Sequence, residues 1–82
     1  MSFVYILKSQ KDGKLYVGAT DNVEARVAKH NKGQVQSTMS RRPLTLVFSK
    51  EFETLGEARK FEWMLKNTPG GGKLKKRLAN GA

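Results

Sequence analysis

Residues 3–18, FVYILKSQKDGKLYVG, hold two apolar runs on either side of a turn signal, a pattern that predicts a β-hairpin. The first run is apolar at consecutive positions, which is typical of a central strand covered on both faces. Lys11-Asp12-Gly13 predicts a turn, and residues 15–19 then return as the second strand of a hairpin. Each strand carries one tyrosine, Tyr5 and Tyr16. The two phenols are either ordinary sheet residues or face one pocket.

The rest of the chain alternates helix signals with one further strand. Asp21 with Glu24, and Thr54 with Glu57, resemble capping boxes that open helices, and Gly33 suits the end of the first of them. The elements are expected as a helix over about 22–32, a loop over 34–42, a strand over 44–49, a helix over about 55–67, a break over 68–72 and a short basic helix over 73–79. This β-β-α-β-α-α order predicts an α+β fold, with a small three-stranded antiparallel sheet flanked by helices.

Composition narrows the class of protein. The 82 residues suit one domain over 1–82, with a core of about 3–67 and a basic segment over 68–82. The absence of cysteine excludes a disulfide framework and suits a reducing cytoplasm, where we expect the protein. We also expect no signal peptide and no membrane span, because the longest apolar run is far shorter than the ~20 residues that cross a bilayer.

Charge points to a polyanionic partner. The net charge is +9, and residues 66–82 contribute five basic side chains and no acidic one. Such a balance favours phosphate polymers or anionic membrane surfaces. The alternative for the C-terminal segment is a solubilising, partly disordered tail. A nucleic acid makes better use of the same residues.

Glu62 lies where an apolar residue is expected. On a helix it falls within about 40° of both Leu55 and Ala58, on the stripe that should face the core. An unpartnered buried carboxylate costs several kcal/mol, so Glu62 needs a partner. That partner is a bound cation, or Arg26 or a lysine in an ion pair, unless the carboxylate reaches water at the end of the stripe.

Arg26 and His30 form a second polar pair beside an apolar stripe, that of Val23 and Val27. Their i, i+4 spacing lets both side chains reach one spot. A lone histidine in such a place is more often a satisfied core residue than a catalytic one, but an adjacent arginine on a basic protein favours a phosphate site.

Tyr5, Tyr16, Arg26, His30 and Glu62 are thus the inward or near-inward polar set. Phosphodiester hydrolysis uses groups of these kinds. A carboxylate can hold a hard divalent ion, an arginine stabilises phosphate charge, and a phenol or imidazole can relay a proton from water. Residue types and spacing alone indicate metal-assisted phosphate chemistry and no more.

The spaced motifs resemble those of a known family, the GIY-YIG nucleases. Phe3-Val4-Tyr5 and Tyr16-Val17-Gly18 are similar to its paired motif, and Asp21 to Asn31 is similar to its next segment. Further matches are Arg42-Pro43, Glu57-Ala58, Glu62 and Lys66. The resemblance covers about residues 3–66 and implies a nuclease with one divalent cation, Mg²⁺ or Mn²⁺. Departures are Phe3 in place of the first glycine of the family name, Ala19, Ser37 and the three glycines at 70–72.

The resemblance also implies roles for single residues. Glu62 would be the metal ligand and Arg26 the catalytic, phosphate-binding arginine. Tyr5 and Tyr16 would lie at the pocket, where one of them accepts or positions the proton of water. His30 would contact the nucleophile or substrate, and Gly18 would let substrate approach the backbone closely.

Other residues are expected to contact nucleic acid. These are Arg41, Arg42, Lys66, Lys73, Lys75, Lys76 and Arg77. Trp63 projects about 80° from Leu55, so we expect it to pack at the edge of the apolar stripe, with stacking on a base as the alternative.

The sequence therefore predicts a metal-dependent endonuclease that hydrolyses the phosphodiester bonds of DNA with low sequence specificity, in DNA processing or repair. The alternative is a basic nucleic-acid-binding module that does not cleave. A binder would need only its Lys and Arg surface, which would leave Glu62 unexplained on an apolar face. Oligomeric state and the choice of DNA over RNA stay open at this point.

Overall fold

The structure, a computed structural model, describes residues 1–81. Its elements are β1 (Ser2–Ser9), β2 (Leu15–Thr20), α1 (Val23–Asn31), a short 3₁₀ helix η1 (Met39–Arg41), β3 (Leu44–Phe52), α2 (Leu55–Asn67) and α3 (Pro69–Ala79). The three strands form one antiparallel sheet in the order β2-β1-β3. The predicted α+β class, strand number and order of elements are confirmed.

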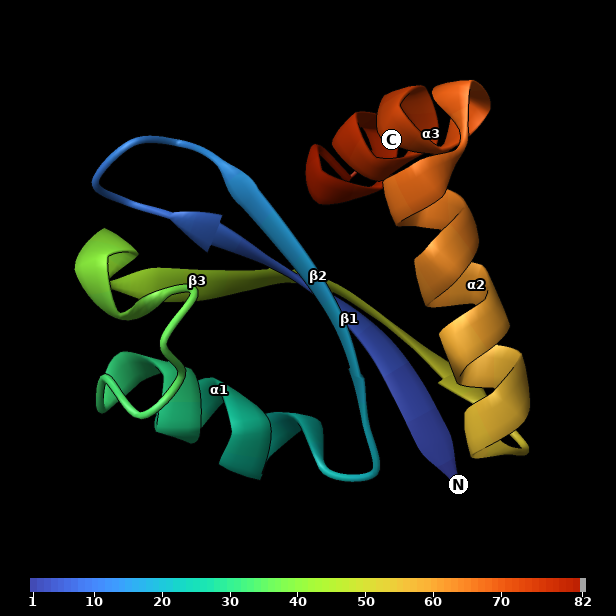
Figure 1. The fold of residues 1–82 in the computed structure, drawn as a ribbon, viewed down its shortest axis with the longest axis horizontal. Coiled ribbons are helices and arrows are strands. Elements are labelled where there is room, and N and C mark those ends of the chain that lie inside the picture. The colour runs from blue at the N-terminus through green and yellow to red at the C-terminus, as the bar shows by residue number, and fades with distance from the viewer. Residues whose placement is uncertain (82) are drawn as a thin grey trace.

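The sheet lies between two helical layers. Figure 1 shows α1 on one face and α2 with α3 on the other. Because β1 is central, its side chains alternate between two clusters. Val4 and Ile6 pack with α2, whereas Tyr5 and Leu7 pack on the α1 side with Leu44. The apolar first run is therefore a strand covered on both faces, as its pattern predicts.

The helix starts follow local hydrogen bonding. The capping box predicted at Asp21 is wrong, because Asn22 is in the extended conformation and its Oδ1 accepts a hydrogen bond from the Ala25 N–H at 3.0 Å. The cap predicted for α2 is confirmed, since Thr54 Oγ1 accepts from the Glu57 N–H at 3.2 Å. Gly33 has a φ of +78°, which suits glycine just past the end of α1.

The predicted break at 68–72 is wrong, because α3 begins at Pro69 and contains all three glycines. Thr68 ends α2 and caps α3, where its Oγ1 accepts from the Gly71 N–H at 3.0 Å. Proline at the first helical position loses no hydrogen bond. Gly71 is buried, and a Cβ there would collide with the Met64 carbonyl oxygen. Glycine thus permits a sharp turn between two helices instead of ending the helical structure.

The remaining differences are extensions of predicted elements. β3 runs to Phe52, beyond the predicted residue 49, because pairing with β1 continues to Ser2. The predicted loop before it contains η1. Leu74 and Leu78 of α3 pack against the core, so the basic C-terminal segment is folded onto the sheet rather than a free tail.

Candidate active site

A chain of polar side chains runs through the α1 side of the sheet. The Arg26 Nε–H donates to the Tyr5 hydroxyl at 3.4 Å, and that hydroxyl lies 3.0 Å from His30 Nε2. His30 Nδ1 lies 2.8 Å from Thr38 Oγ1, and the Thr38 hydroxyl has the Val35 carbonyl at 3.4 Å as an acceptor. The i, i+4 pair on α1 therefore meets at one spot, the Tyr5 phenol.

Burial favours the neutral forms of Tyr5 and His30, the two titratable groups in the inner part of this row of polar side chains. His30 and Thr38 are completely buried, and Tyr5 is 1% exposed. Burial lowers the pKa of His30, and the charges of Arg26 and Lys29 lower it further. Burial raises the pKa of Tyr5, against the hydrogen bond from Arg26 that lowers it. A neutral imidazole has one acceptor nitrogen. His30 Nε2 can therefore accept a hydrogen bond from the Tyr5 hydroxyl, while Nδ1–H donates one to Thr38 Oγ1.

Tyr16 lies on the outer side of the same cluster. Its ring centroid is 4.9 Å from that of His30, in an edge-on arrangement, and 6.4 Å from that of Tyr5. Unlike Tyr5, it is only partly buried. Of the two tyrosines, Tyr16 is therefore the one with a surface open to solvent.

Glu62 reaches this cluster through a lysine. Its Oε2 accepts a hydrogen bond from Lys66 Nζ at 2.8 Å, and its side chain is 22% exposed. The same Nζ lies 5.6 Å from the Tyr16 ring centroid. Of the partners open from the sequence, a lysine one turn along α2 is the one present, and the carboxylate also reaches water.

The carboxylate chemistry at Glu62 fits one hard divalent ion. Mg²⁺ keeps several waters and is often held by one or two carboxylates together with substrate phosphates. Within residues 1–81 no group of three or more His, Cys, Asp or Glu side chains could hold a metal by itself. The Lys66 ammonium bonds one oxygen of this carboxylate, Oε2.

Gly18 lies directly across the sheet from Tyr5. A Cβ at this position would collide with the Tyr5 hydroxyl and ring. The family resemblance implied that Gly18 lets substrate approach the backbone closely. The structure gives this glycine another purpose, which is to leave room for the phenol in the Arg26–His30 chain.

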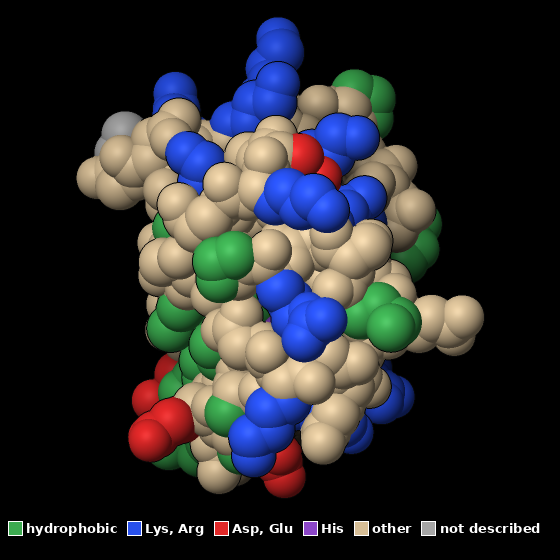
Figure 2. All heavy atoms as spheres, turned by 90° about the vertical axis from the view of Figure 1, so that its left-hand side faces the viewer, with side chains coloured by type: hydrophobic (Ala, Val, Ile, Leu, Met, Phe, Trp, Pro, Cys, Tyr) green, Lys and Arg blue, Asp and Glu red, His purple; other side chains and the backbone are tan. Residues whose placement is uncertain are grey.

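Three of the residues predicted to bind nucleic acid line one groove of about 550 Å³. They are Arg41, Lys75 and Lys76, and Lys8 and Lys14 join them. We call these five residues the basic groove. It lies where the β1–β2 turn meets α3, and Figure 2 shows Lys and Arg side chains spread over the face that carries this turn. Asp12 is the nearby acid, 3.8 Å from Arg41.

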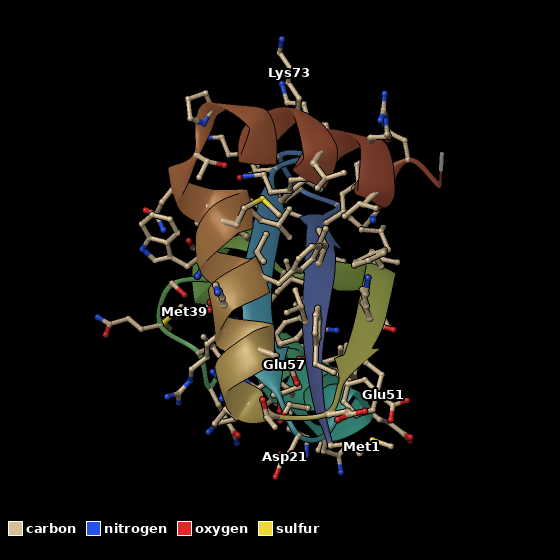
Figure 3. All side chains as sticks on the ribbon, turned by 90° about the vertical axis from the view of Figure 1, so that its right-hand side faces the viewer. Met1, Asp21, Met39, Glu51, Glu57 and Lys73 are labelled. Atoms are coloured by element: carbon tan, nitrogen blue, oxygen red, sulfur yellow. The ribbon has the colours of Figure 1, made fainter. Side chains whose placement is uncertain are left out.

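The other predicted contacts are scattered. The Arg42 Nε–H donates to the Met39 carbonyl at 2.8 Å, and its guanidinium covers Gly33. Lys66 belongs to the Glu62 pair. Figure 3 shows Lys73 pointing away from the molecule, and Arg77 is exposed. Lys73 and Arg77 are not among the residues that line the basic groove.

Sequence reasoning missed three contributors. Lys8 and Lys14 gave no signal because the hairpin brings them to α3 only in three dimensions. Thr38 gave none because it lies in a stretch without periodicity. The expectation that Trp63 packs at an edge is wrong, since the residue is 62% exposed.

In the part of the chain that the structure describes, no helix has both the length and the apolar character needed to cross a membrane.

Comparison with known proteins relates the chain to one family. The GIY-YIG catalytic domain matches residues 1–77. A UPF0213 protein of Staphylococcus aureus (strain Mu3 / ATCC 700698) is 49% identical over 65 residues, which are 78% of each chain. A UPF0213 protein of Staphylococcus haemolyticus is 45% identical over 74 residues, 89% of each chain.

A solved structure shows the same fold. The solution NMR structure of a UPF0213 protein from Bacillus halodurans superimposes with a TM-score of 0.57 at 33% sequence identity. The match covers 98% of this chain and 84% of that one. With the GIY-YIG domain spanning nearly all of its residues, the chain belongs to the GIY-YIG nuclease family.

Proposed function

We propose that this protein is a divalent-metal-dependent endonuclease that cleaves phosphodiester bonds of DNA, with low sequence specificity, in DNA processing or repair. The observation that carries the proposal is the convergence of Arg26 and His30 on the Tyr5 phenol, with Tyr16 and the Glu62–Lys66 pair beside it. A basic binding surface by itself requires neither an arginine and a phenol held together at one spot nor a carboxylate beside them.

Arg26 binds the phosphate in this scheme. Its Nε is occupied by Tyr5, which fixes the guanidinium plane and leaves the two NH₂ groups to donate to phosphate oxygens. Charge that develops on those oxygens in the transition state is stabilised by donors already in place.

Tyr16 handles the proton of the attacking water, because it is the tyrosine with a surface open to solvent. Tyr5 and His30 position this group and Arg26 from the buried side. His30 is therefore a positioning residue. It is completely buried with both nitrogens bonded to protein, so direct contact with substrate is not part of the proposal.

Glu62 would hold the Mg²⁺ or Mn²⁺ ion, whose chemistry is to polarise the phosphate and stabilise the leaving oxygen. Lys66 would leave the carboxylate when the ion binds and could then contact a phosphate of the same strand. Low sequence specificity follows from the basic groove, since contacts to phosphates carry no base information.

The test is nicking of supercoiled plasmid with and without Mg²⁺ or Mn²⁺. Glu62→Gln and Arg26→Ala should each abolish cleavage while the variants stay folded. Glu53→Gln removes an exposed carboxylate outside the cluster and is the matched control, with activity equal to the parent.

A second outcome would favour the alternative function. The ion pair that already satisfies Glu62 is what a non-cleaving nucleic-acid-binding module would keep. Binding that weakens with salt, together with no cleavage by the parent under any metal condition, would replace the endonuclease proposal with that module.

A further inference from the structure

Trp63 is a large apolar side chain placed in water. It is the one tryptophan of the chain, and 62% of it is exposed. On α2 it points almost directly away from Ala58 and Leu65, the buried residues of that helix. An apolar side chain stabilises a protein in proportion to the area that folding removes from water, so at this position Trp63 contributes little to the fold.

The neighbours of Trp63 on the helix surface are polar and mostly cationic. The positions three and four residues away hold Arg59, Lys60, Lys66 and Asn67, all exposed. None of them is acidic. A site for a protein partner would centre on further apolar groups and would desolvate these cations at a cost. An aromatic face ringed by cations instead suits single-stranded nucleic acid, whose bases stack while its phosphates take the charges.

Trp63 also adjoins the candidate active site. It follows Glu62 in the chain, and Lys66 lies between it and the cluster, bonded to Glu62 and placed over the Tyr16 ring. A strand whose base rests on Trp63 would therefore run its backbone past Lys66 toward Glu62 and Tyr16.

We propose that Trp63 stacks on an unpaired base next to the phosphodiester that is cut, so that the protein binds DNA with unpaired nucleotides more tightly than fully paired duplex. Duplex bases are already stacked on each other and offer no free face. The stacking stands on the exposure and surroundings of Trp63. The position of the cut rests on the proposed function.

The lone tryptophan makes the test direct. An oligothymidylate of a dozen nucleotides is titrated into the full chain without divalent metal, and the intrinsic fluorescence is recorded. Stacking should quench the emission, whereas a blunt-ended duplex of equal phosphate number should quench it much less.

Variants measure the energy of the contact. By anisotropy of a labelled oligothymidylate, Trp63→Ala should weaken binding about 5- to 150-fold, from the 1–3 kcal/mol that one base stack is worth. Trp63→Phe keeps an aromatic face and should retain most of the affinity. Leu55→Ala removes another exposed apolar side chain of α2 and should change nothing.

These experiments test the stacking of Trp63 independently of the proposed endonuclease activity. Binding with unchanged emission, or equal affinity of Trp63→Ala and the parent, would overturn the stacking even if plasmid is nicked. Quenching and loss of affinity in Trp63→Ala would uphold the stacking even if the parent never cleaves DNA.

Discussion

Tyr5 shows how one residue links packing to chemistry. The phenol is held on one side by Arg26 and on the other by His30, and Thr38 continues the chain to the Val35 backbone. Among residues 1–81, no buried side-chain nitrogen or oxygen lacks a hydrogen-bond partner. A buried polar chain with every member satisfied fixes orientation, and here it orients the Arg26 side chain.

The two tyrosines should separate packing from catalysis. Tyr5→Phe leaves His30 Nε2 buried without a partner, which should reduce the free energy of unfolding by about 1–3 kcal/mol. Tyr16→Phe should change that free energy by less than about 0.5 kcal/mol but lower the cleavage rate at least about a hundredfold. Urea unfolding and initial rates of plasmid nicking measure the two effects. Equal loss of stability in both variants would contradict the distinction.

His30 should make stability depend on pH in one window. Its folded pKa lies below the ordinary value of 6.5, so below about pH 6.5 the unfolded chain binds a proton that the folded chain does not. The stabilisation is complete above pH 6.5 and is lost as pH falls through the folded pKa. The free energy of unfolding should therefore be lower at pH 5.5 than at pH 7.5.

The folded pKa of His30 can be measured directly, because it is the single histidine of the chain. The chain contains one, so its imidazole proton resonances can be followed by NMR without assignment, alongside urea unfolding at each pH. A resonance that titrates at or above pH 6.5 in the folded protein would contradict the prediction.

At the scale of elements, the junction of α2 and α3 shows where sequence reasoning fails. Proline and three glycines normally end a helix, and the pattern alone predicts a break. In the structure Thr68 serves both helices, and the missing side chain of Gly71 lets α3 start directly against Met64 and Leu65. From the sequence alone, a close approach between two helices looks the same as a flexible joint.

The three glycines should respond differently to alanine. Gly71→Ala forces a Cβ against the Met64 carbonyl and within 2.9 Å of the Leu65 Cα, so it should destabilise by about 1–3 kcal/mol. Nothing lies within 4 Å of a Cβ at Gly70 or Gly72, so alanine there should stabilise by about 0.5–1 kcal/mol. Thermal unfolding of the three variants measures this, and equal behaviour would refute the close-packing argument.

Trp63 illustrates a second limit of helix patterns. With Leu55 as reference, its direction looks like the margin of the apolar stripe. Leu55 is itself 41% exposed, and the buried residues Ala58 and Leu65 set the centre of the stripe well to its other side. Arg26 and His30 were predictable because Val23 and Val27, which define their stripe, pack against the buried cluster of Tyr5, Leu7 and Leu44. Lys66 as partner of Glu62 was only one of several options.

Across the whole molecule, the charges are divided between two ends. Five of the seven acidic residues lie where β2 meets α1 and β3 meets α2, namely Asp21, Glu24, Glu51, Glu53 and Glu57. Figure 3 shows Asp21, Glu51 and Glu57 at the end opposite Lys73. The basic groove lies where α3 meets the β1–β2 turn. Such a division orients the protein on a polyanion, with the acidic end turned away from it.

The basic groove should therefore control the salt dependence of binding. Removing one lysine that neutralises a phosphate lowers the slope of log K against log salt concentration by about 0.9 on duplex DNA, so Lys8→Gln and Lys14→Gln should each reduce it by about that amount. Lys50→Gln removes the same charge from β3, where Lys50 lies over Phe52 and Phe61, and should leave the slope unchanged. Filter binding of a short duplex across salt concentrations measures all three. Equal slopes in the groove variants and Lys50→Gln would mean that net charge, and not this groove, holds the nucleic acid.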